Sequence, residues 1–173
     1  MNTASLLTTQ YGILQRQFSG TLKDLTLKQL QWQPVPEANS IGFLLWHILR
    51  TWDSYASLIE NQDELYESEG WRERFGLDTR GRGVEGSDTG TEFAPEDVRL
   101  VKPQPETLLD YLKALSDQAE RSLGAAIDEN LSQEMIVPWW PEPPTIARVH
   151  IHILAHSFIH LGEAQYLSGL VTE

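Results

Sequence analysis

Four of the five histidines lie close together near the end of the chain, at positions 150, 152, 156 and 160. The surrounding segment, Thr145–Leu170, carries apolar side chains at intervals of three and four residues, which predicts an α-helix. On such a helix His152, His156 and His160 fall on one stripe, whereas His150 points to another side. Imidazoles four residues apart lie close enough to bind the same metal ion. His156 and His160 are therefore a candidate pair of metal ligands.

This pair needs at least one further ligand from elsewhere in the chain. The remaining histidine is His47, and the absence of cysteine means that nitrogen and oxygen atoms must hold any metal. His47 falls on the broad apolar face of a second predicted helix, Ile41–Glu60, beside leucines. Three imidazoles that leave a fourth position open are typical of a catalytic metal site. Water or a substrate thiol bound there would be acidified and could react at neutral pH.

A second interpretation treats these histidines as a polar network inside the core. A single histidine on an apolar helix is more often hydrogen-bonded to a neighbour than bound to a metal. Several imidazoles on one buried stripe nevertheless need partners for their nitrogen atoms, because an unpaired buried polar group is costly. The residues alone favour the metal site and leave the polar network open.

Four segments have the helical spacing of apolar residues. They are Ser5–Leu25, Ile41–Glu60, Pro105–Ala126 and Thr145–Leu170. Strand patterns are almost absent, so the sequence predicts an all-α four-helix bundle whose inward side chains meet in a core able to hold a metal. A chain of 173 residues suits one well-buried domain and is short for two. We therefore expect a single domain over residues 1–173.

The long segment between the second and third helices, Asn61–Gln104, breaks this pattern. Its central part, Gly81–Gly90, is rich in glycine and polar residues and is predicted to be an exposed loop with little structure of its own. A loop of this length in a compact domain is either mobile or functional, often as a lid over a site. Trp71, Phe75 and Leu77 are candidates to attach its first part to the bundle.

The charge and hydropathy of the chain exclude some classes of partner. The net charge is −12, from 25 acidic and 13 basic residues, and no basic patch is visible. Such a surface repels phosphate backbones, so nucleic-acid binding is not expected. No apolar run reaches the roughly 20 residues that span a bilayer, and the N-terminus lacks the layout of a signal peptide. We therefore expect a cytoplasmic protein without a membrane partner.

Two stretches of the sequence resemble the DinB/YfiT-like superfamily of metalloenzymes. The first contains Trp32-Gln-Pro34 and runs on to Asn39-Ser-Ile-Gly-Phe-Leu-Leu-Trp-His47, and the second is His156-Ser-Phe-Ile-His160-Leu-Gly-Glu163. The resemblance covers most of the chain but not the region of residues 81–90. It implies a four-helix bundle, often a homodimer, with a divalent ion, most typically zinc or nickel, bound by His47, His156 and His160.

Two further residues lie near these ligands in the sequence. His152 precedes the pair by one helical turn and is expected to support the ligands or to be a structural neighbour. Glu163 stands where the family often has glutamine. A carboxylate three residues after His160 can orient a ligand, act as a base or simply face solvent, and the sequence leaves these roles open.

The resemblance also suggests a reaction. Characterised relatives transfer low-molecular-weight thiols such as mycothiol or bacillithiol, or use them as cofactors in isomerisation. It therefore implies a metal-dependent thiol S-transferase, or a related hydrolase, that acts on a small-molecule substrate and activates a bound thiol or water. The alternative is a non-catalytic bundle that binds a metal or small ligand as a sensor, carrier or stress-response partner.

Overall fold

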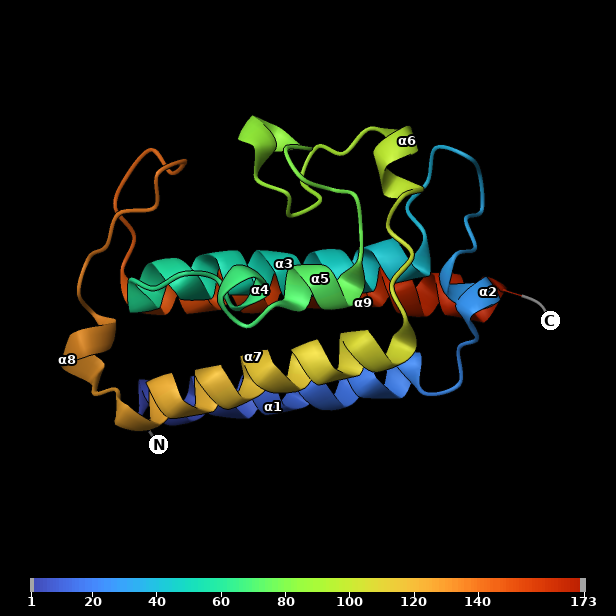
Figure 1. Cartoon of the computed structure of the whole chain (residues 1–173). Coiled ribbons are helices and arrows are strands. Elements are labelled where there is room, and N and C mark those ends of the chain that lie inside the picture. The colour runs from blue at the N-terminus through green and yellow to red at the C-terminus, as the bar shows by residue number, and fades with distance from the viewer. Residues whose placement is uncertain (1, 172–173) are drawn as a thin grey trace.

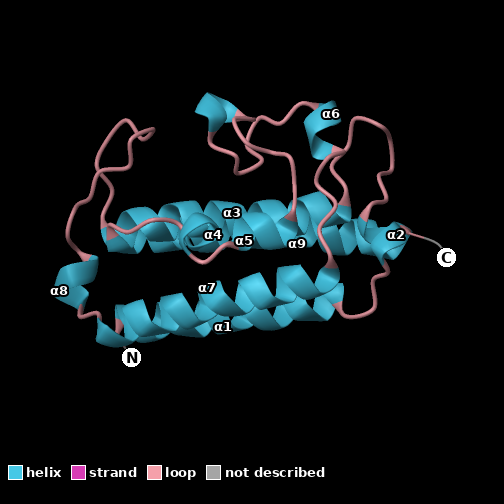
Figure 2. Ribbon diagram, in the orientation of Figure 1, coloured by secondary structure: helices cyan, strands magenta, loops and turns pink. Residues whose placement is uncertain are grey.

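Four long helices lie side by side in the computed structural model, which describes residues 2–171 (Figure 1). They are α1 (Thr3–Leu22), α3 (Ile41–Glu60), α7 (Pro105–Ala125) and α9 (Ile146–Leu170). Every regular element in this part of the chain is helical, as Figure 2 shows. The prediction of an all-α four-helix bundle with a long connection between its second and third helices is confirmed.

The bundle has two layers, with α1 beside α7 and α3 beside α9 (Figure 1). The two helices of each layer run in opposite directions, whereas α3 and α7, which follow one another along the chain, run in the same direction. Parallel neighbours require a connection that returns along the length of the bundle. Residues 61–104 make this connection, which we call the crossing segment.

Short helices interrupt the connections between the long ones. The crossing segment contains α4 (Leu65–Ser68), α5 (Trp71–Phe75), the 3-10 helix η1 (Val84–Gly86) and α6 (Pro95–Val98). Outside it lie α2 (Leu27–Leu30) and α8 (Asp128–Leu131). As predicted, Trp71 and Phe75 are buried, and they attach the crossing segment to the bundle.

Polar caps determine where several helices begin. The side chains of Ser40 and Thr145 accept hydrogen bonds from backbone amides at the start of α3 and α9, a role that serine and threonine commonly have at helix N-termini. The predicted first helix was too long, because α1 ends at Leu22 and not at Leu25. Thr26 forms a capping box with Gln29 and starts the separate helix α2, which requires the chain to turn before it.

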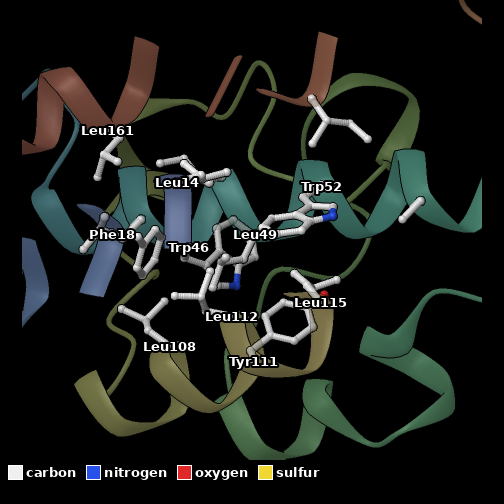
Figure 3. Close-up of a cluster of buried hydrophobic side chains, with 14 of the residues drawn as sticks. Leu14, Phe18, Trp46, Leu49, Trp52, Leu108, Tyr111, Leu112, Leu115 and Leu161 are labelled. Atoms are coloured by element: carbon white, nitrogen blue, oxygen red, sulfur yellow. The ribbon is translucent and has the colours of Figure 1, made fainter. Parts of the chain in front are cut away.

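Helix α3 is buried around most of its circumference, because the crossing segment covers the side that the other long helices leave free. All of its residues from 41 to 53 are buried. Trp46 and Trp52 lie off the apolar stripe that the sequence predicts, yet they are 0% and 1% exposed. Figure 3 shows both tryptophans in the core, together with Leu14 and Phe18 from α1 and Leu112 from α7.

Asp53 is a fully buried carboxylate on α3. It accepts hydrogen bonds from the backbone amides of Leu65 and Tyr66, at 3.0 and 2.8 Å, and from the hydroxyl of Tyr111 on α7. Arg50, one turn earlier and 1% exposed, lies 3.5 Å from the same carboxylate. Asp53 therefore holds the beginning of α4 against two long helices.

Arg50 extends this connection along the crossing segment. Its guanidinium donates to the Glu64 carboxylate at 2.7 Å and to the backbone carbonyl of Asp88 at 3.3 Å, and it lies 3.8 Å above the centre of the Tyr66 ring. The Asp88 carboxylate forms an ion pair with Arg72 at 2.6 Å. These contacts fix two distant parts of the crossing segment to α3.

The prediction that Gly81–Gly90 is an exposed loop is wrong for its last part. Residues 84–87 are exposed, but residues 88–90 are buried against α3. The physical reason is the pairing of Asp88 with two arginines, since its carbonyl binds Arg50 and its carboxylate binds Arg72. These partners lie far away in the sequence, so local composition could not indicate them.

None of the helices in residues 2–171 combines the length and the apolar character that crossing a membrane requires.

We predict that Asp53→Ala lowers the free energy of unfolding by about 3 to 5 kcal/mol, because it removes one of the two carboxylate partners of the buried Arg50 and the acceptor of the first amides of α4. Urea denaturation followed by circular dichroism measures this change. Asp117→Ala is the matched control, because Asp117 pairs with Lys113 on the exposed surface of α7. Its loss should cost less than about 1 kcal/mol. Equal effects of the two substitutions would contradict the structural role of Asp53.

Candidate metal site

Helices α3 and α9 bring three histidines together, His47 from α3 and His156 and His160 from α9. One ring nitrogen of each histidine lies within 4.8 Å of the corresponding nitrogens of the other two. The Nε2 atoms of His47 and His156 are 3.1 Å apart. Two nitrogens bound to one tetrahedral zinc ion would be roughly 3.3 Å apart, because each lies about 2.0 Å from the metal. The spacing of His47 and His156 therefore fits a shared ion, and His160 lies close enough to be a third ligand.

His47 is oriented by the backbone of the crossing segment. Its Nδ1 lies 2.6 Å from the carbonyl oxygen of Thr89. A carbonyl can only accept, so Nδ1 carries the proton and donates it, which leaves the lone pair on Nε2. The Phe43 ring stacks on the imidazole, with an angle of 11° between the planes. The nitrogen that faces the other histidines is thus the one free to bind a metal.

His160 is oriented by Glu163, one turn later on α9. Its Nδ1 lies 2.7 Å from a carboxylate oxygen of Glu163, which is half exposed. This contact directs the Nδ1 proton toward the carboxylate and leaves Nε2 available. A carboxylate bound to the second nitrogen of a metal-binding histidine is a common arrangement that fixes the ring and increases its basicity. Of the roles that the sequence left open for Glu163, this geometry favours orientation of His160.

Burial keeps the imidazoles of His47 and His156 neutral. It lowers the pKa of His47 to about 4 and the pKa of His156 to about 3, and the neighbouring histidines lower the pKa of His156 further. A metal ligand must be neutral imidazole, so both rings are in the required form at pH 7. The buried Nδ1 of His156 has no hydrogen-bond partner within residues 2–171. Hydrogen bonds between protein groups therefore do not satisfy all the nitrogens, as the polar-network interpretation would require.

The remaining two histidines lie outside the cluster. His150 faces α1, where its Nδ1 shares a 2.9 Å hydrogen bond with the hydroxyl of Tyr11, and burial lowers its pKa to about 4. His152 lies on the same stripe as His156, and its ring packs edge-on against the rings of Tyr55 and Trp140. Burial also lowers the pKa of His152. His152 contributes to the wall beside the cluster and not to the cluster itself.

The three clustered histidines line a pocket of about 790 Å³ between α3, α9 and the crossing segment. Its aromatic walls are Phe43, Tyr55, Phe93 and Trp139, and no lysine or arginine of the described chain lines it. A pocket of this size accommodates a small organic molecule. Trp139, from the connection between α8 and α9, is therefore a wall of this site.

Gly90 allows the crossing segment to approach His47. Its φ of +99° is rarely adopted by residues with a side chain. A Cβ atom at this position would lie 2.9 Å from Nδ1 of His47 and 3.2 Å from both Phe43 and Trp46. Glycine is therefore required for the neighbouring Thr89 carbonyl to reach the imidazole. Sequence reasoning missed both residues, because a glycine in a glycine-rich loop gives no sign of what it approaches.

The sequence of the chain matches the model of one protein family, and the helical fold is consistent with that match. The family model of the DinB superfamily matches residues 10–164, which is most of the chain. This chain belongs to the DinB superfamily. The resemblance carried by the two histidine-containing stretches is thus confirmed.

A solved structure shows the same DinB-type fold over nearly the whole chain. It is described as the conserved protein of a locus from Enterococcus faecalis and is 26% identical in sequence to this chain. The similarity covers 99% of this chain and 98% of the other, with a TM-score of 0.85. No curated protein matches the chain.

We predict that Gly90→Ala destabilises this DinB-superfamily protein more than Gly81→Ala does. Both glycines have positive φ, but a Cβ at Gly81 would meet nothing within 4 Å. Gly81→Ala therefore measures backbone strain alone, about 1 to 2 kcal/mol, whereas Gly90→Ala adds the collision with His47. Chemical denaturation measures both values. The ¹⁵N chemical shift of the His47 ring should change only in Gly90→Ala, and equal behaviour of the two variants would contradict the close approach.

Proposed function

We propose that this protein is a divalent-metal-dependent enzyme whose ion is bound by His47, His156 and His160. The observation that best supports the proposal is the convergence of these imidazoles at a pocket large enough for a substrate. The Thr89 carbonyl and the Glu163 carboxylate turn the Nε2 atoms of His47 and His160 toward the shared position. Such support is typical of residues that bind metals.

The chemistry of the ligands narrows the choice of metal. Three imidazoles with no thiolate suit zinc, nickel, iron or copper, and among these the family resemblance favours zinc or nickel. The pocket beside them leaves room for a further ligand from solvent or substrate. Three protein ligands and one open position are typical of catalytic sites, because structural zinc sites use four protein ligands.

We infer that the reaction is a thiol S-transfer or a related hydrolysis. A bound ion of this kind lowers the pKa of a coordinated thiol or water and so produces a nucleophile at neutral pH. The chain contains no cysteine, so a thiol nucleophile would come from a low-molecular-weight cofactor. Membership of the DinB superfamily supports this reaction class through the resemblance described above.

The residues of the chain supply binding and shielding in this proposal. The aromatic walls contributed by Phe43, Phe93 and Trp139 bind an apolar part of the substrate. The crossing segment covers His47, which is 6% exposed, and limits the access of bulk water. The neutral imidazole of His152 lies one turn from His156 at the pocket wall and is placed to exchange a proton with a bound substrate.

Metal content tests the proposed ligands. Tag-free protein that has never contacted an immobilised-metal column is analysed by mass spectrometry as wild type, His47→Ala, His160→Ala and His150→Gln. We expect about one divalent ion per chain in the wild type and in His150→Gln, and almost none in the other two variants. His150 is the matched control because it lies on the same helix but faces Tyr11. Full occupancy in all four proteins would show that the ligand set is wrong.

Glu163 provides a finer test, because its role depends on accepting the Nδ1 proton of His160. Glu163→Ala should weaken zinc binding by about tenfold, the lower end of the range for supporting residues, since the carboxylate is half exposed. Glu163→Gln should retain most of the affinity, because the amide oxygen can still accept this proton. Competition with a chromophoric chelator measures both affinities. Similar losses in the two variants would argue against a hydrogen-bonding role.

The alternative is a bundle that binds a metal or small ligand without turnover, as a sensor, carrier or stress-response partner. In its metal-binding form it predicts the same metal content as the enzyme and differs only in activity. A screen of low-molecular-weight thiols with electrophilic acceptors, using the metal-loaded wild type and His160→Ala, separates the two. Thiol consumption that requires His160 supports the enzyme, and its absence across the screen favours the alternative.

A further inference from the structure

The pocket has a second polar end, about two helical turns away from His47. Tyr55 follows His47 by eight residues on the same face of α3, which is roughly 12 Å along the helix axis. On the antiparallel helix α9, His152 precedes His156 by one turn. The rings of Tyr55 and His152 consequently meet, with their centroids 4.9 Å apart, and both side chains line the pocket.

The hydroxyl of Tyr55 has an unusual set of partners. Its oxygen accepts two hydrogen bonds, from the indole Nε1 of Trp139 at 2.9 Å and from that of Trp140 at 3.2 Å. A hydroxyl oxygen offers two acceptor positions and one proton, so the two indoles occupy all of its acceptor capacity. The only further hydrogen bond that Tyr55 can make is one in which it donates.

No residue of the described chain accepts the Tyr55 proton, although Tyr55 is only 7% exposed. A largely buried donor without an acceptor is costly, and such groups in folded proteins usually have a partner in water or a ligand. Because Tyr55 lines the pocket, a molecule bound there can supply the missing acceptor.

The charge of the pocket restricts the chemistry of that acceptor. No lysine or arginine of residues 2–171 lines the pocket, so no cationic side chain is present to balance a bound carboxylate or phosphate, and the lining residues Glu85 and Glu92 disfavour an anion further. The Tyr55 hydroxyl is a neutral donor, and its surroundings are the aromatic rings of Trp139 and His152. These features suit a neutral carbonyl oxygen, as in an amide, ester or ketone.

We propose that Tyr55 is a substrate-binding residue that donates a hydrogen bond to a neutral carbonyl oxygen of the substrate. The substrate then carries no anionic group near this end of the pocket, and its carbonyl group lies one to two helical turns from the atom that approaches His47, His156 and His160. Only the statement about the histidine end rests on the proposed metal-dependent function.

A purely structural role for Tyr55 would be to fasten the connection between α8 and α9 through the two tryptophans. That role predicts that loss of the hydroxyl changes stability and affects all ligands alike. The substrate-binding role predicts selectivity, with loss of affinity only for ligands that carry a carbonyl. The test therefore compares two ligands of similar length, of which one carries an amide carbonyl and the other does not.

The experiment uses cobalt-loaded protein and two thiols of similar length, N-acetylcysteamine and butanethiol. The absorption of the cobalt–thiolate bond gives the dissociation constant of each. We expect Tyr55→Phe to weaken binding of N-acetylcysteamine by about fivefold and to leave butanethiol unchanged. Tyr166→Phe is the control, because it removes the same hydroxyl from a side chain that is 69% exposed on α9. It should change neither constant.

A second variant tests whether disturbed local packing, and not loss of the hydroxyl, explains the result for Tyr55→Phe. Trp139→Phe removes one indole donor but keeps the Tyr55 proton, so the preference for N-acetylcysteamine over butanethiol should persist. Loss of the preference in Trp139→Phe as well as in Tyr55→Phe, or its retention in both, would overturn the assignment of the Tyr55 hydroxyl.

A metal-free measurement distinguishes failure of the proposed metal site from failure of the Tyr55 proposal. If cobalt does not bind, the proposed function fails, and the protein is then titrated with N-methylacetamide while the indole N–H resonances of Trp139 and Trp140 are followed by NMR. Saturable shifts in the wild type and in Tyr166→Phe, absent in Tyr55→Phe, support carbonyl binding at Tyr55. Their absence in the wild type overturns it.

Discussion

The buried ion pair of Arg50 and Asp53 connects the bundle to the segment that covers the site. Neither side chain is exposed by more than 1%, so their charges are stable only with the full set of partners that the crossing segment provides. Asp53 holds the first amides of α4, and Arg50 binds the carbonyl of Asp88. The next residue, Thr89, orients His47. The orientation of one candidate ligand thus depends on charges one to two helical turns away from it on α3.

The order of the helices explains why a long crossing segment exists at all. Because α3 and α7 are parallel, the chain has to return along the bundle between them, and it does so over α3 (Figure 1). A short hairpin between these helices would have left the histidine face of α3 open to solvent. The same connection that the topology requires therefore provides one wall of the pocket and the carbonyl that binds His47.

The pocket combines two different kinds of polar group on one pair of helices. At one end, ring nitrogens of three histidines converge to within 4.8 Å of one another, an arrangement suited to a cation. At the other end, the Tyr55 hydroxyl has all its acceptor capacity occupied and only a proton to offer. The aromatic side chains of Phe43, Phe93 and Trp139 also line the pocket, and no lysine or arginine of residues 2–171 does. A molecule that satisfies both ends has to present an electron pair at each.

The sequence alone determined the elements whose signals are local. Periodic apolar residues predicted α3 with its correct bounds and the end of α7 to within one residue, and the four-residue spacing of His156 and His160 predicted that both lie on one face of α9. Only the tertiary structure decided the features that join residues far apart in the chain. These are the burial of Asp88, the carbonyl contact of Thr89, the close approach of Gly90 and the two indole bonds to Tyr55. Helical periodicity arises from backbone geometry within a few residues, whereas these contacts depend on how two distant segments pack, and single-sequence patterns do not encode that packing.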